Sequence, residues 1–516
     1  MNRREYTVRS LSVAVLVGLL SIISGIPHVS AQTVGQWTPD QRVSGYLDDT
    51  FTPFLLADQN RTVHALASQW VGNGEGDRQL AIVYRQWSLM GGWTKPVDIL
   101  LSPIGDAQIQ GAFLDSSGYL HVIFWSSNKY GAFIYYSKAP ITSADLGSAW
   151  SFPIAIGDKA VEPASAALAG DAQGNLIVIY SGNYDGAGVY EIHSDDSGDT
   201  WSNPFSVFLT YDTTLVPYSL RLFMSQTGQL HATWNVVTST GVDTSLHYAR
   251  YDVVKNQWSQ PVMLNKRIDI QDYFGPSFPA LVDTGESVVI VYNNGNPFSG
   301  RPVNPGRPVQ EVSISDDGGQ TWKDPIVPFY RLVGRSGEHT MAVDSNNIAH
   351  TLFVQRIEYQ DQDTGDYRIY GGIWHSEFSN GVWSDPDRFI TTVAPHDVRS
   401  VVSQGNVLLA VWREDPGVGQ DGIWYSYSIL NSPELPVVVP PIPVLEVLPT
   451  IAPDIASEPT PATVPAVETQ EINIIGSVPS GLMTNPAAPL IIAIVPVILI
   501  LAVALVIYQQ YRNRNN

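Results

Sequence analysis

Two histidines stand beside a carboxylate at positions that the rest of the sequence does not repeat. The two pairs are Glu338–His339 and His396–Asp397. Imidazole and carboxyl groups are the side chains that most often act as general acids and bases. We therefore predict Glu338, His339, His396 and Asp397 as candidate catalytic residues. Solvated polar residues at a surface opening are the alternative interpretation.

The other histidines fall into recurring positions. The chain has 10 histidines, of which His28 lies in the N-terminal apolar segment. A residue that recurs at the same place in each repeat is typical of architecture, whereas one that appears once is a better site candidate. Spacing assigns the recurring ones to two positions, namely His64, His121, His231 and His350 at one, and His193, His247 and His375 at the other.

Arginine and aromatic residues near the two pairs could bind a ligand. A guanidinium group forms paired hydrogen bonds with a carboxylate, and an aromatic ring offers a broad apolar face. Packing between structural elements is the alternative for the aromatic residues. The predicted ligand-binding residues are Arg356, Arg399, Arg413, Glu414 and Tyr273.

Composition excludes several kinds of site and partner. The 516 residues include no cysteine, so disulfides, thiolate zinc sites, iron–sulfur clusters and a cysteine nucleophile are excluded. The net charge of −21 argues against nucleic-acid binding, because few groups would neutralise phosphates. We expect no cofactor and no metal. The acidic loop at residues 361–366 resembles a calcium-binding loop only faintly, and a plain acidic loop is the preferred interpretation.

The two ends of the chain read as targeting segments. An arginine-bearing start, an apolar stretch and Val29-Ser30-Ala31 predict a signal peptide over residues 1–31. An uncharged run at 487–508 is long enough for a transmembrane helix, and the arginines after it predict a cytoplasmic tail at 509–516. The proline-rich segment 431–486 predicts an extended extracellular stalk. We therefore expect a single-pass type I membrane protein whose domain at 32–430 lies outside the cell.

A short unit, Trp-Ser/Thr-x-Pro or close to it, recurs between these ends. Four-stranded repeats that cannot bury both faces alone are typical of a β-propeller. We predict an all-β propeller of seven four-stranded blades, with six blades and an extra hairpin as the alternative. An altered copy, Gln36-Trp37-Thr38-Pro39, predicts that the N-terminal strand closes the ring. The units begin at Trp93, Trp150, Trp201, Trp258, Trp322 and Trp383.

Two repeats carry a fuller motif, S-x-D-x-G-x-T-W. Here the chain resembles the sialidase superfamily of propellers with bacterial neuraminidase repeats, also called Asp boxes. The resemblance covers about residues 33–430 and implies that the box is a structural turn far from the ligand face. Its residues in this chain are Ser194, Asp196, Gly198, Thr200 and Trp201 in one repeat, and Ser315, Asp317, Gly319, Thr321 and Trp322 in the other.

The resemblance leaves two functions open. Enzymes of the superfamily use three arginines, a Tyr–Glu pair and an aspartic acid, and usually carry a Tyr/Phe-Arg-Ile-Pro motif near the first blade. In this chain the corresponding stretch is Asp49-Thr50-Phe51-Thr52-Pro53-Phe54, without that motif, and no clear Tyr–Glu pair can be assigned. We therefore predict a surface-anchored module that recognises a glycan or another extracellular ligand. The alternative is a glycoside hydrolase of the exo-alpha-sialidase type.

Overall fold

The computed structural model describes a chain built from β-strands. It describes residues 34–72, 78–129, 131–160, 165–171, 173–252, 255–267, 275–295, 308–332, 337–360, 367–392, 395–414 and 421–442. The predicted signal peptide, transmembrane helix and tail lie outside these residues, as does most of the predicted stalk. Within the described ranges, no helix is long and apolar enough to cross a membrane.

The first half of the chain forms three sheets. The first has the order β2-β3-β4-β5, with β6 also paired to β4. The second has eight strands and the third has five. Their bounds are β2 (Phe54–Ala57), β3 (Val63–Val71), β4 (Gln79–Ser88), β5 (Gly92–Trp93) and β6 (Val97–Leu101); β7 (Gln108–Leu114), β8 (Tyr119–Asn128), β9 (Gly131–Pro140), β10 (Ile154–Ala160), β11 (Ala166–Gly170), β12 (Leu176–Gly182), β13 (Gly188–Ser194) and β14 (Phe205–Leu209); and β15 (Leu215–Met224), β16 (Leu230–Thr238), β17 (Asp243–Asp252), β18 (Gln257–Trp258) and β19 (Val262–Lys266).

The second half forms three more sheets, and two short 3-10 helices lie between β9 and β10. These helices are η1 (Ile141–Ser143) and η2 (Gly147–Ala149). The sheets contain β20 (Ser277–Asp283), β21 (Val288–Asn294) and β22 (Val309–Ser315); β23 (His339–Val343), β24 (Ala349–Gln360), β25 (Tyr367–Ser379), β26 (Val382–Trp383) and β27 (Asp387–Ile390); and β28 (Pro395–Ser403), β29 (Val407–Glu414) and β30 (Ile423–Ile429) with β1 (Gln41–Arg42).

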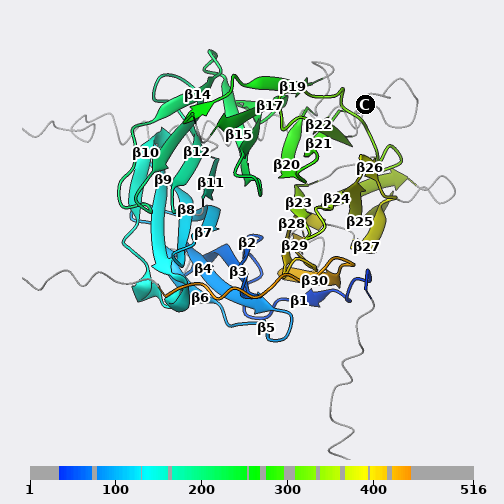
Figure 1. The fold of residues 1–516 in the computed structure, drawn as a ribbon, viewed down its shortest axis with the longest axis horizontal. Coiled ribbons are helices and arrows are strands. Elements are labelled where there is room, and N and C mark those ends of the chain that lie inside the picture. Colours follow the sequence, from blue (N-terminus) through cyan, green and yellow to red (C-terminus); the bar gives the residue numbers. More distant parts are fainter. Residues whose placement is uncertain are drawn as a thin grey trace, which may run out of the picture. The chain divides into compact units, whose positions relative to one another are not determined.

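The sheets stand side by side around a central opening (Figure 1). Strands in the middle of each sheet are buried on both faces, as in β12, whose seven residues are all buried. This follows from packing, because the apolar cores lie between adjacent sheets, for example between β2–β4 and β7–β9. The innermost strands β2, β7, β11, β15, β20, β23 and β28 contact one another in closed cyclic order. The architecture is therefore an all-β propeller, as predicted.

The sheets do not form the seven separate four-stranded blades that the repeats predict. The described strands form six hydrogen-bonded sheets, of which five have at least four strands and one has three. Two expected blades share the eight-stranded sheet, because Ala160 of β10 pairs with both Ala132 of β9 and Gly182 of β12. The three-stranded sheet has only an isolated bridge, between Val312 and Ile326, in place of an outer strand.

The N-terminal strand pairs with the end of the propeller sequence. In β1, Gln41 pairs with Tyr425 and Arg42 with Trp424 of β30. The Trp unit before it extends this contact through the Trp37–Ser428 bridge. Strands nearly 400 positions apart in the sequence are thus neighbours, which joins the first and last parts of the ring as the altered Trp unit predicts.

The start of the predicted stalk is bound to the propeller. The backbone N–H of Leu435 donates to Gln404 and that of Val438 to Gln59, at 2.8 and 2.9 Å. Glu434 pairs with Arg61. This segment, orange in Figure 1, belongs to a compact unit that ends at Leu445. The second unit, Glu446–Asn516, lies outside the described residues.

Candidate functional site

A cavity of about 520 Å³ lies where the innermost strands begin and the second strands of the sheets end. We call it the mouth cavity. A second cavity shares part of its lining and is bordered by the innermost strands. The residues that line the mouth cavity are Phe51, Thr52, Ser68, Gln108, Ile109, Tyr218, Phe278, Gly337, Glu338, Pro395, His396, Asp397, Arg399 and Arg413.

One polar cluster in the mouth cavity comes from the pairing of β28 with β29. Asp397 is the register partner of Arg413, which brings the Arg413 Nε to 2.9 Å from the Asp397 Oδ2. The other oxygen, Oδ1, lies 2.6 Å from Nδ1 of His396. The Arg413 guanidinium also lies over the ring of Phe51, 5.1 Å from its centroid. An imidazole that is 44% exposed beside an anchored carboxylate can accept or donate a proton at the cavity wall.

A second cluster joins residues from three of the innermost strands. Glu338 immediately precedes β23, and its Oε2 pairs with Arg399 of β28. The same oxygen lies 3.7 Å from Arg221 Nη2 of β15. Burial, together with the nearby Arg221 and Arg413 guanidinium groups, lowers the pKa of Arg399 to about 9. Three arginines thus meet two carboxylates, with Arg399 and Arg413 in the mouth cavity and Arg221 in the adjoining second cavity. This arrangement favours an additional anionic group.

Not all the predicted site residues reach the mouth cavity. His339 is only 2% exposed, and its Nδ1 lies 3.1 Å from the carbonyl oxygen of Phe278. Burial lowers its pKa to about 4, so the imidazole is neutral at pH 7. Glu414 ends β29 and is buried outside the mouth lining. Tyr273 lies outside the described residues, and only the backbone of Arg356 is described, paired with Gly371.

Several residues of the two clusters and of the cavity wall were not among the predicted site residues. Arg221 shares Glu338 with Arg399, and Phe51 lies under Arg413. Both precede or belong to innermost strands, as do Gln108 and Tyr218. The available signal was their equivalent place in successive repeats, since residues at the start of each innermost strand converge at one opening.

The opposite end of the strands carries the two S-x-D-x-G-x-T-W turns, and we call it the turn end. In the first turn, Asp196 accepts hydrogen bonds from the Thr200 backbone N–H at 2.8 Å and hydroxyl at 2.6 Å. Ser194 Oγ accepts from the Gly198 N–H at 2.8 Å. The second turn repeats these bonds from Asp317 and Ser315. The Thr200 bonds lower the pKa of Asp196 to about 2, so its carboxylate is occupied in holding the turn.

The predicted grouping of His193, His247 and His375 at one position is wrong. In the pairing of second and third strands, His193 faces Ile177, His247 faces Trp234 and His375 faces Leu352. The turns before the Trp units differ in length, since Ser202 bonds back to His193 and Ser259 to Arg250, but Ser384 to Glu377. A count along the sequence therefore treats unequal positions as equal. Within the described ranges, His350, His375 and Glu377 also form a group that could hold a metal ion.

Comparisons with known proteins place carbohydrate-active enzymes among the structural neighbours. No protein-family pattern and no curated protein matches the sequence. An ulvan lyase is 12% identical over 76% of this chain and 96% of its own, with a TM-score of 0.47. A Hadza microbial sialidase is 11% identical over 76% and 95%, with a TM-score of 0.39. The intramolecular trans-sialidase from Ruminococcus gnavus is 12% identical over 76% and 96%, with a TM-score of 0.37.

Proposed function

We propose that the protein is a sialidase-like propeller of the Asp-box type that binds an acidic saccharide of an extracellular glycan in the mouth cavity. The two S-x-D-x-G-x-T-W turns, which hold themselves by the same hydrogen bonds, support the family assignment. The observation that carries the function is the convergence of Arg399 and Arg413 on one cavity that also presents Phe51 and Tyr218.

The size and chemistry of the cavity support this ligand class. About 520 Å³ lies within the ~300–1,000 Å³ typical of small-molecule sites. Arg399 and Arg413 keep 28% and 19% of their side chains exposed, and each guanidinium has five N–H donors to share between its protein carboxylate and a ligand. An apolar ring such as Phe51 offers packing for the C–H face of a sugar.

A glycan array probed with the tag-free full-length chain in detergent tests the binding function. We expect binding to acidic glycans that falls at least tenfold in Arg399→Gln and in Arg413→Ala. Arg250→Ala is the matched control, because Arg250 lies near the opposite end of β17 from the mouth, and it should bind normally. Equal binding by the two mouth variants and the wild type would contradict the proposal.

A second candidate is hydrolysis of a terminal sugar by an exo-alpha-sialidase type of enzyme. The observation in its favour is the 2.6 Å contact of His396 Nδ1 with Asp397 Oδ1 at an exposed cavity wall. The chain should then turn over a fluorogenic sialoside, and turnover should be lost in His396→Gln, Arg413→Ala and Arg356→Ala. Absence of turnover with retained glycan binding would exclude the hydrolase and support only the binding function.

We also propose that the propeller is displayed outside the cell, attached through the predicted stalk and membrane helix at 487–508. Support comes from the sequence alone, in the signal-like start, the uncharged run and the arginines that follow it. Protease treatment of intact cells should release a soluble propeller, and deletion of residues 487–516 should send it into the medium. Resistance of the propeller to protease on intact cells would contradict this topology.

A further inference from the structure

A three-residue cluster recurs at the turn end of the sheets. In the first sheet, His64 Nδ1 lies 2.7 Å from the Tyr84 hydroxyl, and its Nε2 lies 3.3 Å from Asp58. The same chain of contacts runs from Asp115 through His121 to Tyr136 and from Asp283 through His231 to Tyr248, with His–Tyr distances of 2.7 Å in both. Because the ring N–H at Nε2 donates to the carboxylate, the tyrosine hydroxyl can donate to the lone pair at Nδ1.

The sheet that contains β23–β27 breaks this pattern at two positions. His350 keeps its carboxylate, with Nε2 at 3.4 Å from Asp344. The strand position that holds tyrosine in the other three clusters holds His375, whose Nε2 lies 3.0 Å from His350 Nδ1. The residue facing the histidine across the strands is Glu377, where the first sheet has Gln86.

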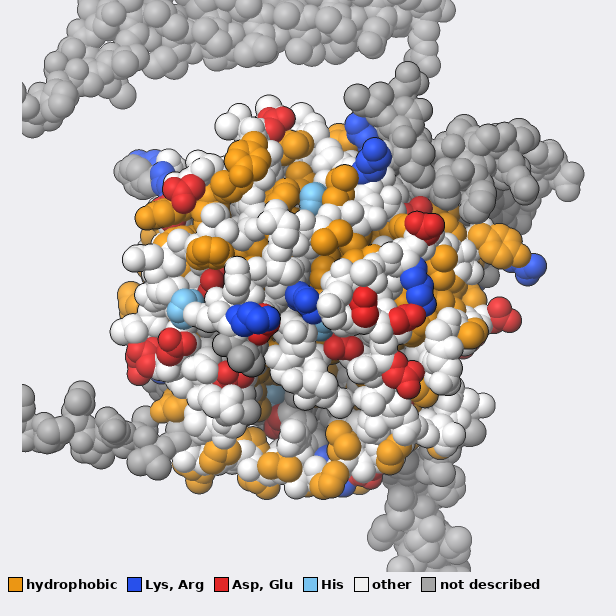
Figure 2. All heavy atoms as spheres, turned by 45° about the horizontal axis from the view of Figure 1, so that its top comes forward, with side chains coloured by type: hydrophobic (Ala, Val, Ile, Leu, Met, Phe, Trp, Pro, Cys, Tyr) orange, Lys and Arg blue, Asp and Glu red, His pale blue; other side chains and the backbone are white. Residues whose placement is uncertain are grey.

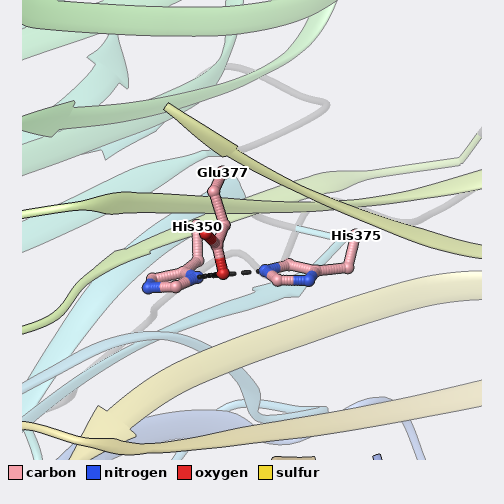
Figure 3. Close-up of side chains that lie close together, drawn as sticks. All are labelled: His350, His375 and Glu377. Atoms are coloured by element: carbon pink, nitrogen blue, oxygen red, sulfur yellow. Dashed lines mark hydrogen bonds and ion pairs between the residues drawn. The ribbon is translucent and has the colours of Figure 1, made fainter. Parts of the chain in front are cut away.

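These two exchanges bring three metal-ligating atoms together. His350 Nδ1 lies 3.0 Å from His375 Nε2 and 3.7 Å from Glu377 Oε1, and the three side chains converge in Figure 3. Two ligands at the ~2.0–2.1 Å bond length of tetrahedral zinc stand about 3.3 Å apart. Small adjustments of the three side chains would therefore place all three atoms on one ion.

The surroundings orient the group for a metal. Asp344 receives the Nε2–H of His350, which leaves the Nδ1 lone pair directed at the other ligands. Such a carboxylate behind a ligating histidine fixes the ring and its tautomer. Asp344 is held in turn by the backbone N–H groups of Asn346 and Ile348 at 2.9 Å each and by the Ser432 hydroxyl.

Access to the group is from one side. The side chains of His350 and Asp344 are each 1% exposed, whereas that of Glu377 is 45% exposed. Trp37, from the N-terminal segment, meets the His375 ring edge-on, with centroids 5.5 Å apart. Segments from both ends of the propeller sequence, through Trp37 and Ser432, therefore flank the group.

We propose that His350 Nδ1, His375 Nε2 and Glu377 Oε1 bind a divalent transition-metal ion, with zinc as the best match to two imidazoles and one carboxylate. Three protein ligands with one solvent-facing side leave a fourth position for water. Because the ion would tie β24 to β25 beside the two segments that complete the ring, metal binding stabilises this seam of the propeller. The site lies at the turn end, apart from the mouth cavity.

Metal analysis of the full-length, tag-free chain tests this site. After chelator treatment and desalting, we expect one zinc per chain on re-addition and a raised thermal midpoint, because a ligand that binds only the folded state stabilises it. Cobalt should give the visible absorption of a four-coordinate ion. His375→Tyr restores the tyrosine of the other clusters and should fold without binding zinc, and Glu377→Gln, which copies Gln86, should weaken binding at least tenfold.

The partly exposed His193 provides the matched control, since His193→Gln removes a histidine whose side chain is 32% exposed and could hold adventitious metal. It should bind zinc as the wild type does. Absence of stoichiometric zinc from the wild-type chain, or equal zinc binding by His375→Tyr, would overturn the proposal. In that case His350 and His375 share one proton in an N–H···N hydrogen bond.

Discussion

The turn end and the mouth of the propeller are both rich in polar side chains, yet these side chains bond differently. At the turn end, Asp196 and Asp317 bond to their own turns, and His121 is closed off between Asp115 and Tyr136. At the mouth, guanidinium and carboxylate groups pair across different strands and keep part of their surface exposed. Polar groups that satisfy one another locally build the fold, whereas partly exposed groups that converge from several strands can bind a ligand.

A glycine at the turn end should give the largest loss of stability. Gly198 has φ +87°, and an added Cβ would lie 1.9 Å from the Tyr136 hydroxyl oxygen of the neighbouring set of strands. Gly198→Ala combines left-handed strain with this overlap, so we expect a loss of about 3 kcal/mol in the free energy of unfolding. Urea unfolding followed by tryptophan fluorescence measures it.

Gly228 is the matched control for that glycine. It has φ +80° but no neighbouring atom within 4 Å of an added Cβ. Gly228→Ala should therefore cost only the left-handed strain, about 1 kcal/mol. Equal losses in the two variants would show that the contact with Tyr136 contributes nothing.

The buried tyrosine itself should give the next largest effect. The Tyr136 hydroxyl oxygen lies 2.7 Å from His121 Nδ1 and 3.1 Å from the Ser197 carbonyl oxygen. Tyr136→Phe leaves the buried His121 Nδ1 without its partner, whereas the Ser197 carbonyl keeps Lys138 Nζ at 2.8 Å. This change should cost about 1–3 kcal/mol of unfolding free energy. Tyr218→Phe at the half-buried mouth should change it by less than about 0.5 kcal/mol. A larger loss of unfolding free energy in Tyr218→Phe than in Tyr136→Phe would contradict the view that buried polar groups of the turn end stabilise the fold more than those of the mouth.

The sequence predicted the ring and its closure more securely than the site. The Trp units mark a real packing position, because a tryptophan such as Trp201 packs edge-on against Tyr136 of the preceding set of strands. Spacing could not predict that β10 would pair with two neighbouring strands and merge two sheets. Pairing across sheets depends on hydrogen bonds between strands, which a repeat along one chain does not record.

The candidate site shows the same limit. Glu338 and His339 are adjacent in sequence, but successive side chains of an extended chain point to opposite sides. Glu338 therefore lines the mouth cavity while His339 turns to the Phe278 carbonyl inside the wall. Arg399 and Arg413 were found because each belongs to an innermost or second strand at its mouth end. Arg221, in the same position of another sheet, was missed as a site residue.

A carboxyl group at the mouth end of β17 should make stability depend on pH. Burial raises the pKa of Asp243 to about 7, and its Oδ1 accepts from the Asn235 amide at 2.6 Å. The raised pKa means that the folded state keeps a proton which the unfolded state loses above about pH 4. This contribution is complete at low pH and is lost as the pH rises towards 7, by on the order of 1 kcal/mol per unit.

Asp243→Asn isolates that contribution. The difference in unfolding free energy between wild type and variant should change between pH 4 and pH 7 in favour of the variant, measured by urea unfolding across that range. Asp324→Asn, at an exposed position of the turn end, should leave the pH profile of the wild type unchanged. Parallel profiles for the wild type and Asp243→Asn would contradict the raised pKa.

Removing an exposed ion pair should give the smallest change in unfolding free energy, and this change should be equal at the two ends. At the turn end, Lys138 Nζ lies 2.7 Å from Asp199, whose side chain is 71% exposed. At the mouth end, Arg78 pairs with Asp49, and both side chains are more than 40% exposed. Because water and salt screen such pairs, Asp199→Asn and Asp49→Asn should each change the unfolding free energy by less than about 0.5 kcal/mol, and less again at high salt. A large loss of unfolding free energy in only one variant would mean that the end of the strand affects stability independently of burial. Small and equal losses would show that the two ends differ in stability only through the burial and local pairing of their polar groups.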